Sequence, residues 1–104
     1  MYCFDIFEVL HLPVKVQKAM NLKHLFYFWK TARSGGVVKA GEALHITPQT
    51  ISGQIRLLED SLDTQLFARD GRNLELTPAG RLAMEYADEM FSLSAELEQA
   101  LRHY

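Results

Sequence analysis

The sequence predicts a mainly helical domain in which three short helices precede a two-stranded β-hairpin and a long C-terminal helix. Two Thr-Pro pairs, at residues 47–48 and 77–78, mark helix starts. An Asp-Gly pair at residues 70–71 separates two partly alternating segments, which is typical of a hairpin. Apolar residues then recur at heptad spacing to the end of the chain. The length of 104 residues suits one domain with a modest core.

The first two predicted helices are separated by a pair of glycines. Apolar residues at helical spacing predict the first helix, and we expect these side chains in the core. They are Leu22, Leu25, Phe26, Trp29 and Ala32. This helix is expected to end at residues 34–36, where two glycines follow a serine. A second, short helix is predicted from Val37 to Leu44, with Gly36 as its N-cap.

The third predicted helix has the strongest start signal. Thr47 can cap it, and Pro48 occupies the first helical position, where its missing N–H costs nothing. One apolar stripe follows, and it consists of Ile51, Ile55, Leu58 and Leu62. The opposite face presents short polar side chains near the start of the helix, and acidic residues only near its end.

The hairpin is predicted from residues 65–69 and 72–77, and the last helix from about residue 78 to 103. That helix carries an a/d heptad seam: Ala83, Tyr86, Met90, Leu93, Leu97, Ala100 and Tyr104. A helix of this length spans about 39 Å at 1.5 Å per residue. Because so small a body would not bury it, we expect the seam to pair with a second copy of the chain. Partial packing of the seam against the first helix of its own chain is compatible with such a dimer.

This order of elements is the plan of a winged helix-turn-helix, whose third helix enters the DNA major groove with its N-terminal residues at the base edges. Gln49 has the donor and acceptor for a bidentate contact with adenine. Thr47, Thr50 and Ser52 suit base edges or phosphates. Arg56 lies one turn beyond Ser52 and suits a phosphate.

The hairpin and the charge distribution add to this interpretation. Arg69 and Arg72 flank the predicted turn, where arginine suits phosphates or a narrow minor groove. The net charge is -2, but residues 21–82 carry eight Lys/Arg against six Asp/Glu. Residues 83–104 carry five acids against Arg102. A mildly basic body is therefore followed by an acidic helix.

Signatures of enzymes are missing from the sequence. The histidines at 11, 24, 45 and 103 are scattered, and none has metal-ligand spacing with Cys3 or a carboxylate. The sequence has no Gly-rich phosphate loop and no nucleophile elbow. We therefore expect no enzymatic activity, no metal and no cofactor. With one cysteine, the chain cannot form an internal disulfide.

The expected organisation has three parts: residues 1–20 as an N-terminal extension, 21–77 as a winged helix-turn-helix, and 78–104 as a linker and dimerisation helix. No apolar stretch approaches the roughly 20 residues of a membrane span. Asp5 and Glu8 stand where a secretory signal would carry Lys or Arg. The expected location is the cytoplasm, without membrane contact.

From Asn21 to about Arg102, the sequence resembles the N-terminal domain of LysR-type bacterial transcriptional regulators. The segments that carry this resemblance recur in order over about four-fifths of the chain. They are residues 22–28, 40–45, 51–59, 66–69 and 76–80. The stretch from Leu44 to Arg56 and the aromatic residues 27–29 look closest to the NhaR-like branch. That branch implies regulation of sodium/proton antiporter genes.

The resemblance implies sequence-specific binding of double-stranded DNA as a homodimer joined by the long helix. It also implies a recognition helix starting near Thr47 and a wing around residues 69–72. Carried over by position, the base-reading candidates are Thr47, Pro48, Gln49, Ser52 and Gly53.

Three positions depart from the family pattern. Pro48-Gln49 stands where the family usually has Gln-Pro, Gly53 where it often has arginine, and Ala40-Gly41 where it usually has paired alanines. The first departure shifts the glutamine by one position, and the second removes a potential guanine or phosphate contact. They bear on the identity of the bases read and not on the fold.

Members of the family normally continue into an effector-binding domain, so we expect no small-molecule effector site in this chain. A truncated fragment is the simplest interpretation of its length. A natural protein of this length would be a constitutive binder, or a competitor that forms mixed dimers. A second hypothesis is a dimerisation or protein-interaction module on a winged-helix scaffold, whose acidic long helix recruits a partner.

Overall fold

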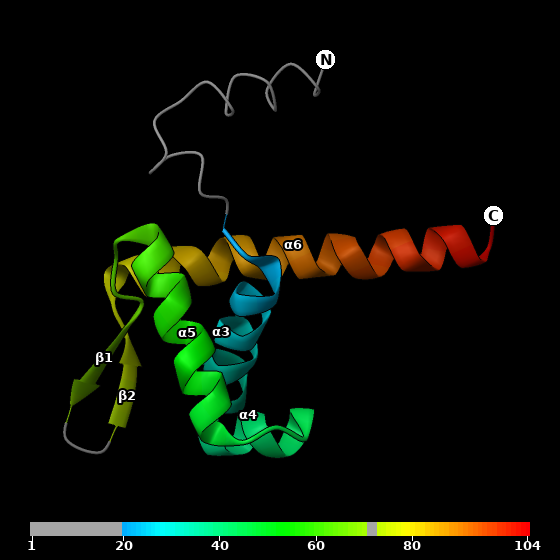
Figure 1. Ribbon diagram of the computed structural model, residues 1–104. Coiled ribbons are helices and arrows are strands. Elements are labelled where there is room, and N and C mark those ends of the chain that lie inside the picture. The colour runs from blue at the N-terminus through cyan, green and yellow to red at the C-terminus, as the bar shows by residue number, and fades with distance from the viewer. Residues whose placement is uncertain (1–19, 71–72) are drawn as a thin grey trace.

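The computed structural model describes residues 20–70 and 73–104. Its elements, in order, are α3 (Leu22–Ser34), α4 (Val37–Leu44), α5 (Pro48–Leu62), β1 (Phe67–Asp70), β2 (Asn73–Leu76) and α6 (Pro78–Arg102). The body consists of α3, α4 and α5, with the strands beside α5, while α6 crosses the body and continues far beyond it (Figure 1). The winged helix-turn-helix prediction is therefore confirmed. Expectations for residues 1–19, 71 and 72 lie outside the described residues.

Helices α4, α5 and α6 begin at the capping residues that the sequence indicates. The Oγ1 atom of Thr47 accepts a hydrogen bond from the backbone N–H of Thr50 at 3.2 Å. At the start of α6, Thr77 Oγ1 accepts from the N–H of Gly80 at 2.9 Å. Gly36 is the N-cap of α4, as predicted, and provides no side-chain bond. Within the described residues, no helix is both long and apolar enough to cross a membrane.

The core lies where α3, α4 and α5 meet, and the start of β1 and α6 close it. Its hydrophobic side chains are Leu25, Phe28, Ala40, Ile51, Ile55, Leu58, Leu66 and Ala87. The predicted stripe of α5 is confirmed except at Leu62, which is 39% exposed at the end of the helix. The predicted stripe of α3 is wrong at its start, because Leu22 is 56% exposed. Phe28, which that stripe omitted, is fully buried.

The wing is a two-stranded antiparallel sheet in which Phe67 pairs with Leu76 and Asp70 with Asn73. It is shorter than predicted, because residues 65–66 and 77 lie outside the strands. Asp70 belongs to β1 and not to the predicted turn pair. The ring of Phe67 lies 5.2 Å from that of Phe28, so the wing is attached directly to the core.

Helix α6 ends at Arg102, one residue before the prediction. Two members of the heptad seam, Ala83 and Met90, pack against the core of their own protomer. The other members are exposed: Tyr86, Leu93, Leu97, Ala100 and Tyr104. Leu82, which the seam omitted, precedes Tyr86 by one turn and is also exposed. The exposed residues form an apolar stripe that α6 presents to solvent, called the α6 stripe below.

Thr31 of α3 is fully buried, and its hydroxyl has no hydrogen-bond partner among the described residues. A buried, unsatisfied polar group costs about 1–3 kcal/mol. Because valine has almost the same shape, we expect Thr31→Val to raise the free energy of unfolding by about 1–2 kcal/mol in urea denaturation. Thr31→Ser keeps the hydroxyl, deletes a buried methyl group and should lower it. A Thr31→Val chain no more stable than the parent would contradict this account.

Candidate nucleic-acid interface

The buried stripe of α5 determines which of its side chains face solvent. Because an α-helix has 3.6 residues per turn, positions between the buried ones point away from the core. The predicted DNA-contacting residues on this outer side are Gln49, Ser52, Gly53 and Arg56, and all four are exposed. Their exposure agrees with the prediction from periodicity, although exposure alone gives them no role.

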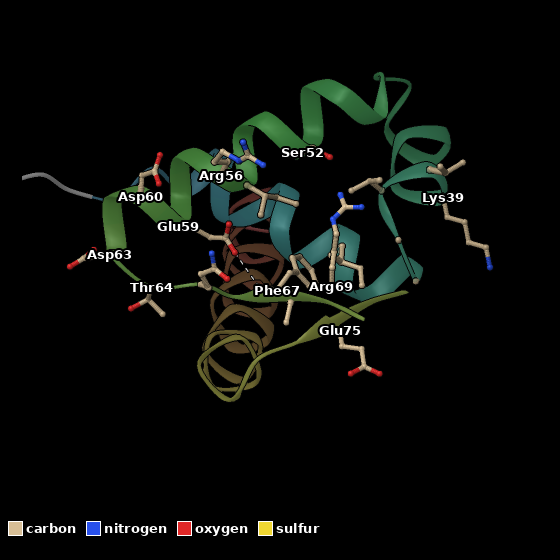
Figure 2. Close-up of a pocket in the computed structure, with 18 residues that line it drawn as sticks. Lys39, Ser52, Arg56, Glu59, Asp60, Asp63, Thr64, Phe67, Arg69 and Glu75 are labelled. Atoms are coloured by element: carbon tan, nitrogen blue, oxygen red, sulfur yellow. Dashed lines mark hydrogen bonds between the residues drawn. The ribbon is translucent and has the colours of Figure 1, made fainter. Parts of the chain in front are cut away.

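A groove runs between α5 and the wing and ends at the start of α4 (Figure 2). Ser52 and Arg56 line it from α5, and Arg69 lines it from β1. Residues singled out in two separate parts of the sequence, α5 and β1, therefore line the same groove. Lys39 of α4 lines the same groove, and nothing in its sequence context distinguished it from other lysines. The predicted contact Arg72 lies outside the described residues.

The charge of the groove varies along its length. Lys39 and Arg69 lie toward one end, with Glu75 beside Arg69, whereas Asp60 and Asp63 lie toward the other end (Figure 2). Arg56 and Glu59 lie between these ends. A polyanion is attracted to the first end and repelled from the second, because the Coulomb term follows the nearest charges. The groove is lined by three basic and four acidic side chains, so a phosphate backbone is favoured only near its Lys39 and Arg69 end.

The first turn of α5 is held by its own threonines. The hydroxyl oxygens of Thr47 and Thr50 are 2.8 Å apart and hydrogen-bonded to each other, and both residues remain exposed. Pro48 is half-buried and packs near Gly41 of α4. These contacts stabilise the first turn of α5, from which Gln49 projects. The hydroxyl groups of Thr47 and Thr50 are therefore engaged in capping this helix.

Glu59 links α5 to the wing, a role that the sequence did not reveal. Its Oε2 atom accepts hydrogen bonds from the backbone N–H groups of Leu66 at 2.8 Å and Phe67 at 3.1 Å. Leu66 and Phe67 follow Glu59 by seven and eight positions, across a loop. No local sequence signal marks a contact over such a distance along the chain. Since β1 begins at Phe67 and carries Arg69, this carboxylate orients the wing relative to α5.

We expect Glu59→Ala to lower the free energy of unfolding by about 2 kcal/mol, because two backbone donors lose a charged acceptor. Denaturation with urea would measure the change. Asp60→Ala is the matched control, since Asp60 is an exposed acid whose side chain makes no hydrogen bond within the described residues. Glu59→Gln keeps an acceptor oxygen and should recover part of the loss. Equal stabilities of the two alanine variants would refute the link.

The fold and this groove define a winged helix-turn-helix domain with a polar helix face beside its wing. Residues 22–81 match the family described as bacterial regulatory helix-turn-helix protein, lysR family. The chain belongs to this family, which confirms the resemblance drawn from the sequence.

Similar proteins include transcriptional regulators from different bacteria. The transcriptional activator protein NhaR of Escherichia coli (strain K12) is 54% identical over 78 residues, which are 75% of this chain and 26% of NhaR. The HTH-type transcriptional regulator YofA of Bacillus velezensis is 39% identical over 80 residues, which are 77% of this chain and 28% of YofA. The chain therefore spans roughly a quarter of the length of these relatives.

Solved structures with the same fold include domains bound to DNA. The BenM domain in complex with catB site 1 DNA has a TM-score of 0.76 and 31% identity, covering 81% of this chain and 93% of that one. The CbnR domain in its complex with DNA has a TM-score of 0.72 and 31% identity, covering 81% of this chain and 97% of that one.

Proposed function

We propose that this chain binds double-stranded DNA sequence-specifically as a homodimer and thereby regulates transcription. The observation that carries the proposal is the common groove of Ser52, Arg56 and Arg69, which places polar and basic side chains from α5 and β1 on one surface. In this proposal α5 enters the major groove and the wing contacts the flanking backbone. The DNA complexes of the similar BenM and CbnR domains support it.

The residues of this interface divide into two groups by the information they read. Gln49 and Ser52 face base edges, with Gln49 offering both a donor and an acceptor to adenine. Arg56, Arg69 and Arg72 neutralise phosphates, which contributes affinity in any sequence. Lys39 joins the second group because it lines the same groove. The remaining candidates, at the helix start and beside Ser52, are Thr47, Pro48, Thr50 and Gly53.

The homodimer is proposed to form through the α6 stripe. Leu93 and Leu97 are 63% and 59% exposed, and they lie beyond the last α6 residues that pack on the body. Exposed apolar residues repeated along one helix face are typical of a surface that pairs with another helix. Two-fold symmetry of such a dimer predicts a pseudo-palindromic site.

The regulated genes are proposed by similarity to NhaR, a transcriptional activator protein. The sequence resembles the NhaR-like branch, for which we expect sodium/proton antiporter genes as targets. The proposed place of action is the bacterial cytoplasm, where chromosomal DNA lies.

Selection from random DNA tests the proposal directly. The purified chain would be mixed with a pool of random duplexes, and the bound fraction sequenced at two salt concentrations. We expect an enriched pseudo-palindrome and an affinity that falls steeply as salt rises. No enrichment at either salt, from a chain shown to be a folded dimer, would overturn DNA recognition. The exposed stripe on the acidic α6 would then favour the protein-interaction module.

Two substitutions separate base reading from phosphate binding. Gln49→Ala should relax the preference at one base pair by about 1–3 kcal/mol and leave binding to random DNA unchanged. Arg69→Ala should weaken binding to every sequence and reduce the salt slope by about one. Lys23→Ala is the control, since it removes an exposed positive charge from outside the groove. Equal losses on specific and random DNA for Gln49→Ala would remove its role in base reading.

A further inference from the structure

Helix α6 leaves the body of the protomer at a short, well-defined segment. Ala87 is fully buried, and Phe91 is half-buried against the core. Every residue from Ser92 to Tyr104 is exposed. The direction of the projecting half of α6 is therefore set by contacts at residues 87–91.

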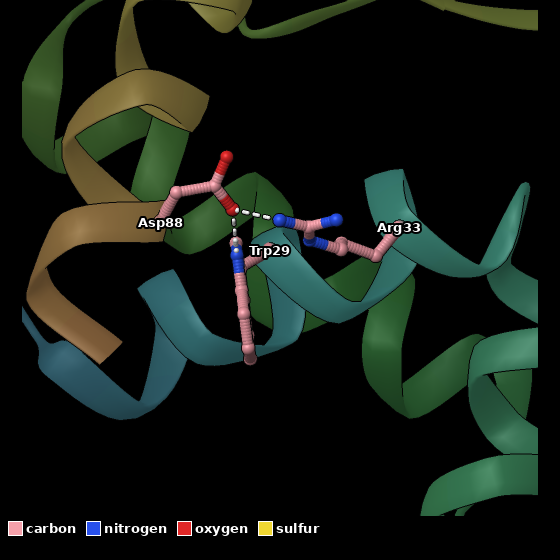
Figure 3. A network of polar contacts seen from close by, with 3 residues as sticks. All are labelled: Trp29, Arg33 and Asp88. Atoms are coloured by element: carbon pink, nitrogen blue, oxygen red, sulfur yellow. Dashed lines mark hydrogen bonds and ion pairs between the residues drawn. The ribbon is translucent and has the colours of Figure 1, made fainter. Parts of the chain in front are cut away.

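At this segment Asp88 receives two hydrogen bonds on the same carboxylate oxygen (Figure 3). The indole Nε1–H of Trp29 donates to Oδ1 at 2.7 Å, and the guanidinium of Arg33 donates to it at 2.7 Å. Both donors lie on α3, so one side chain of α6 is tied to two successive turns of the body. The bonds to Trp29 and then Arg33 also hold the pKa of Asp88 below its usual range.

Phe91 adds aromatic contacts at this segment. The ring of Phe91 lies 4.8 Å from the ring of Trp29 and 5.5 Å from that of Phe26. Aromatic pairs prefer offset or edge-to-face arrangements, but they keep these over centroid distances of about 4.5–7 Å, so they restrain a small rotation of one helix on another only loosely. Hydrogen bonds weaken steeply with misalignment. The hydrogen bonds of Asp88 with Trp29 and Arg33 are therefore the contacts at this segment that best define the angle between α6 and the body.

Because α6 is long, a small change in this angle produces a large displacement of its far end. Arg102, the last residue of α6, lies fourteen positions after Asp88, which corresponds to about 21 Å of helix. A rotation of about 10° at Asp88 would move the far end by about 4 Å, close to the rise of one base pair, about 3.4 Å. In a dimer joined by the α6 stripe, such a change alters the separation of the two DNA-binding surfaces.

We propose that Asp88 is a positioning residue that sets which spacing between two DNA half-sites the dimer accepts. The proposal rests on the proposed function as a DNA-binding homodimer and adds a determinant of its specificity. Asp88 lies on α6 away from the α6 stripe and does not line the groove. Its effect is therefore expected on spacing, and not on the affinity for one half-site.

The test uses duplexes that carry two copies of the selected half-site, separated by spacers that change one base pair at a time. Asp88→Ala removes the acceptor, Asp88→Asn keeps an acceptor oxygen, and Trp29→Phe removes one donor but keeps a ring. Glu85→Ala is the matched control, because Glu85 is an exposed acid on α6 with no hydrogen bond or ion pair to the described residues.

For the unchanged chain and Glu85→Ala, we expect one preferred spacing. For Asp88→Ala, the ratio of the affinities at that spacing and one base pair away should fall about fivefold to tenfold, the worth of about one hydrogen bond, because Arg33 and Asp88 are 56% and 41% exposed and their pair is screened by solvent. Asp88→Asn and Trp29→Phe should lie between these extremes. Affinity for a single half-site should stay unchanged throughout, which also verifies that each variant is folded.

Two negative results are distinguishable. Identical spacing profiles for Asp88→Ala and Glu85→Ala, with normal binding to a half-site, would overturn the role of Asp88 alone. Absence of DNA binding by the unchanged chain would overturn the proposed function, and the role of Asp88 with it.

Discussion

Gly80→Ala is expected to lower the free energy of unfolding by about 3 kcal/mol, the upper end of the usual cost of overpacking. Gly80 is buried in the first turn of α6, and a Cβ atom there would overlap the backbone carbonyl oxygen of Leu66. It would also lie 3.0 Å from Cδ2 of Leu76. The Leu66 carbonyl accepts the N–H of Thr77 at 3.0 Å, so it cannot move without loosening the joint between the wing and α6.

A second glycine provides the control. Gly53 also lies within a helix, but a Cβ atom there meets nothing within 4 Å. Gly53→Ala should therefore raise the free energy of unfolding by about 0.5–1 kcal/mol, since alanine favours the helix. Thermal or urea unfolding of both variants would measure the difference. The same sign of change for both substitutions would contradict the close approach of α6 to Leu66.

Replacing Leu93 and Leu97 together with glutamate is expected to abolish the dimer. Both side chains are exposed on the α6 stripe, and paired helices would bury the new charges without partners. Loss of the second DNA-binding surface should lower the affinity for DNA with two half-sites by about 10²–10⁴, because the linked binding event disappears. The affinity for one half-site should not change. Sedimentation equilibrium and DNA titration would measure both properties.

The control for this substitution adds the same charge to the same turns of α6. Ser92 and Gln99 are exposed and lie on the side of the helix away from the α6 stripe. Ser92→Glu with Gln99→Glu should leave the dimer and the affinity for paired half-sites nearly intact. If both double variants remained dimeric, the dimer interface would lie elsewhere on the chain.

Features with local causes could be predicted from the sequence. Thr47 and Thr77 mark the starts of two helices because their hydroxyls cap neighbouring N–H groups, which is a contact within one turn. The outward orientation of Ser52 and Arg56 follows from helical periodicity and the buried stripe of α5. The wing with Arg69 follows from the hairpin pattern.

Features that depend on neighbouring elements could not be predicted. Leu22 fits the apolar period of α3, yet at the start of the helix no element of the part of the chain that the structure describes covers it. Phe28 is buried because α5 and the wing pack against its side of α3. Glu59 bonds to the backbone beyond a loop, and the groove itself exists only when α4, α5 and β1 are assembled. The DNA contacts of the individual residues stay predictions.

The exposure of α6 beyond Phe91 has a consequence for the helix–coil balance of a single protomer. The packed half of α6 supplies the helical nucleus. The thirteen residues from Ser92 to Tyr104 therefore become helical by propagation alone, without a further nucleation cost. Propagation is close to neutral per residue in water, so this segment gains little order on its own. A second copy that covers the α6 stripe would shift this balance toward the helix. Association and the ordering of the chain end thus become one equilibrium, on which protein concentration acts directly.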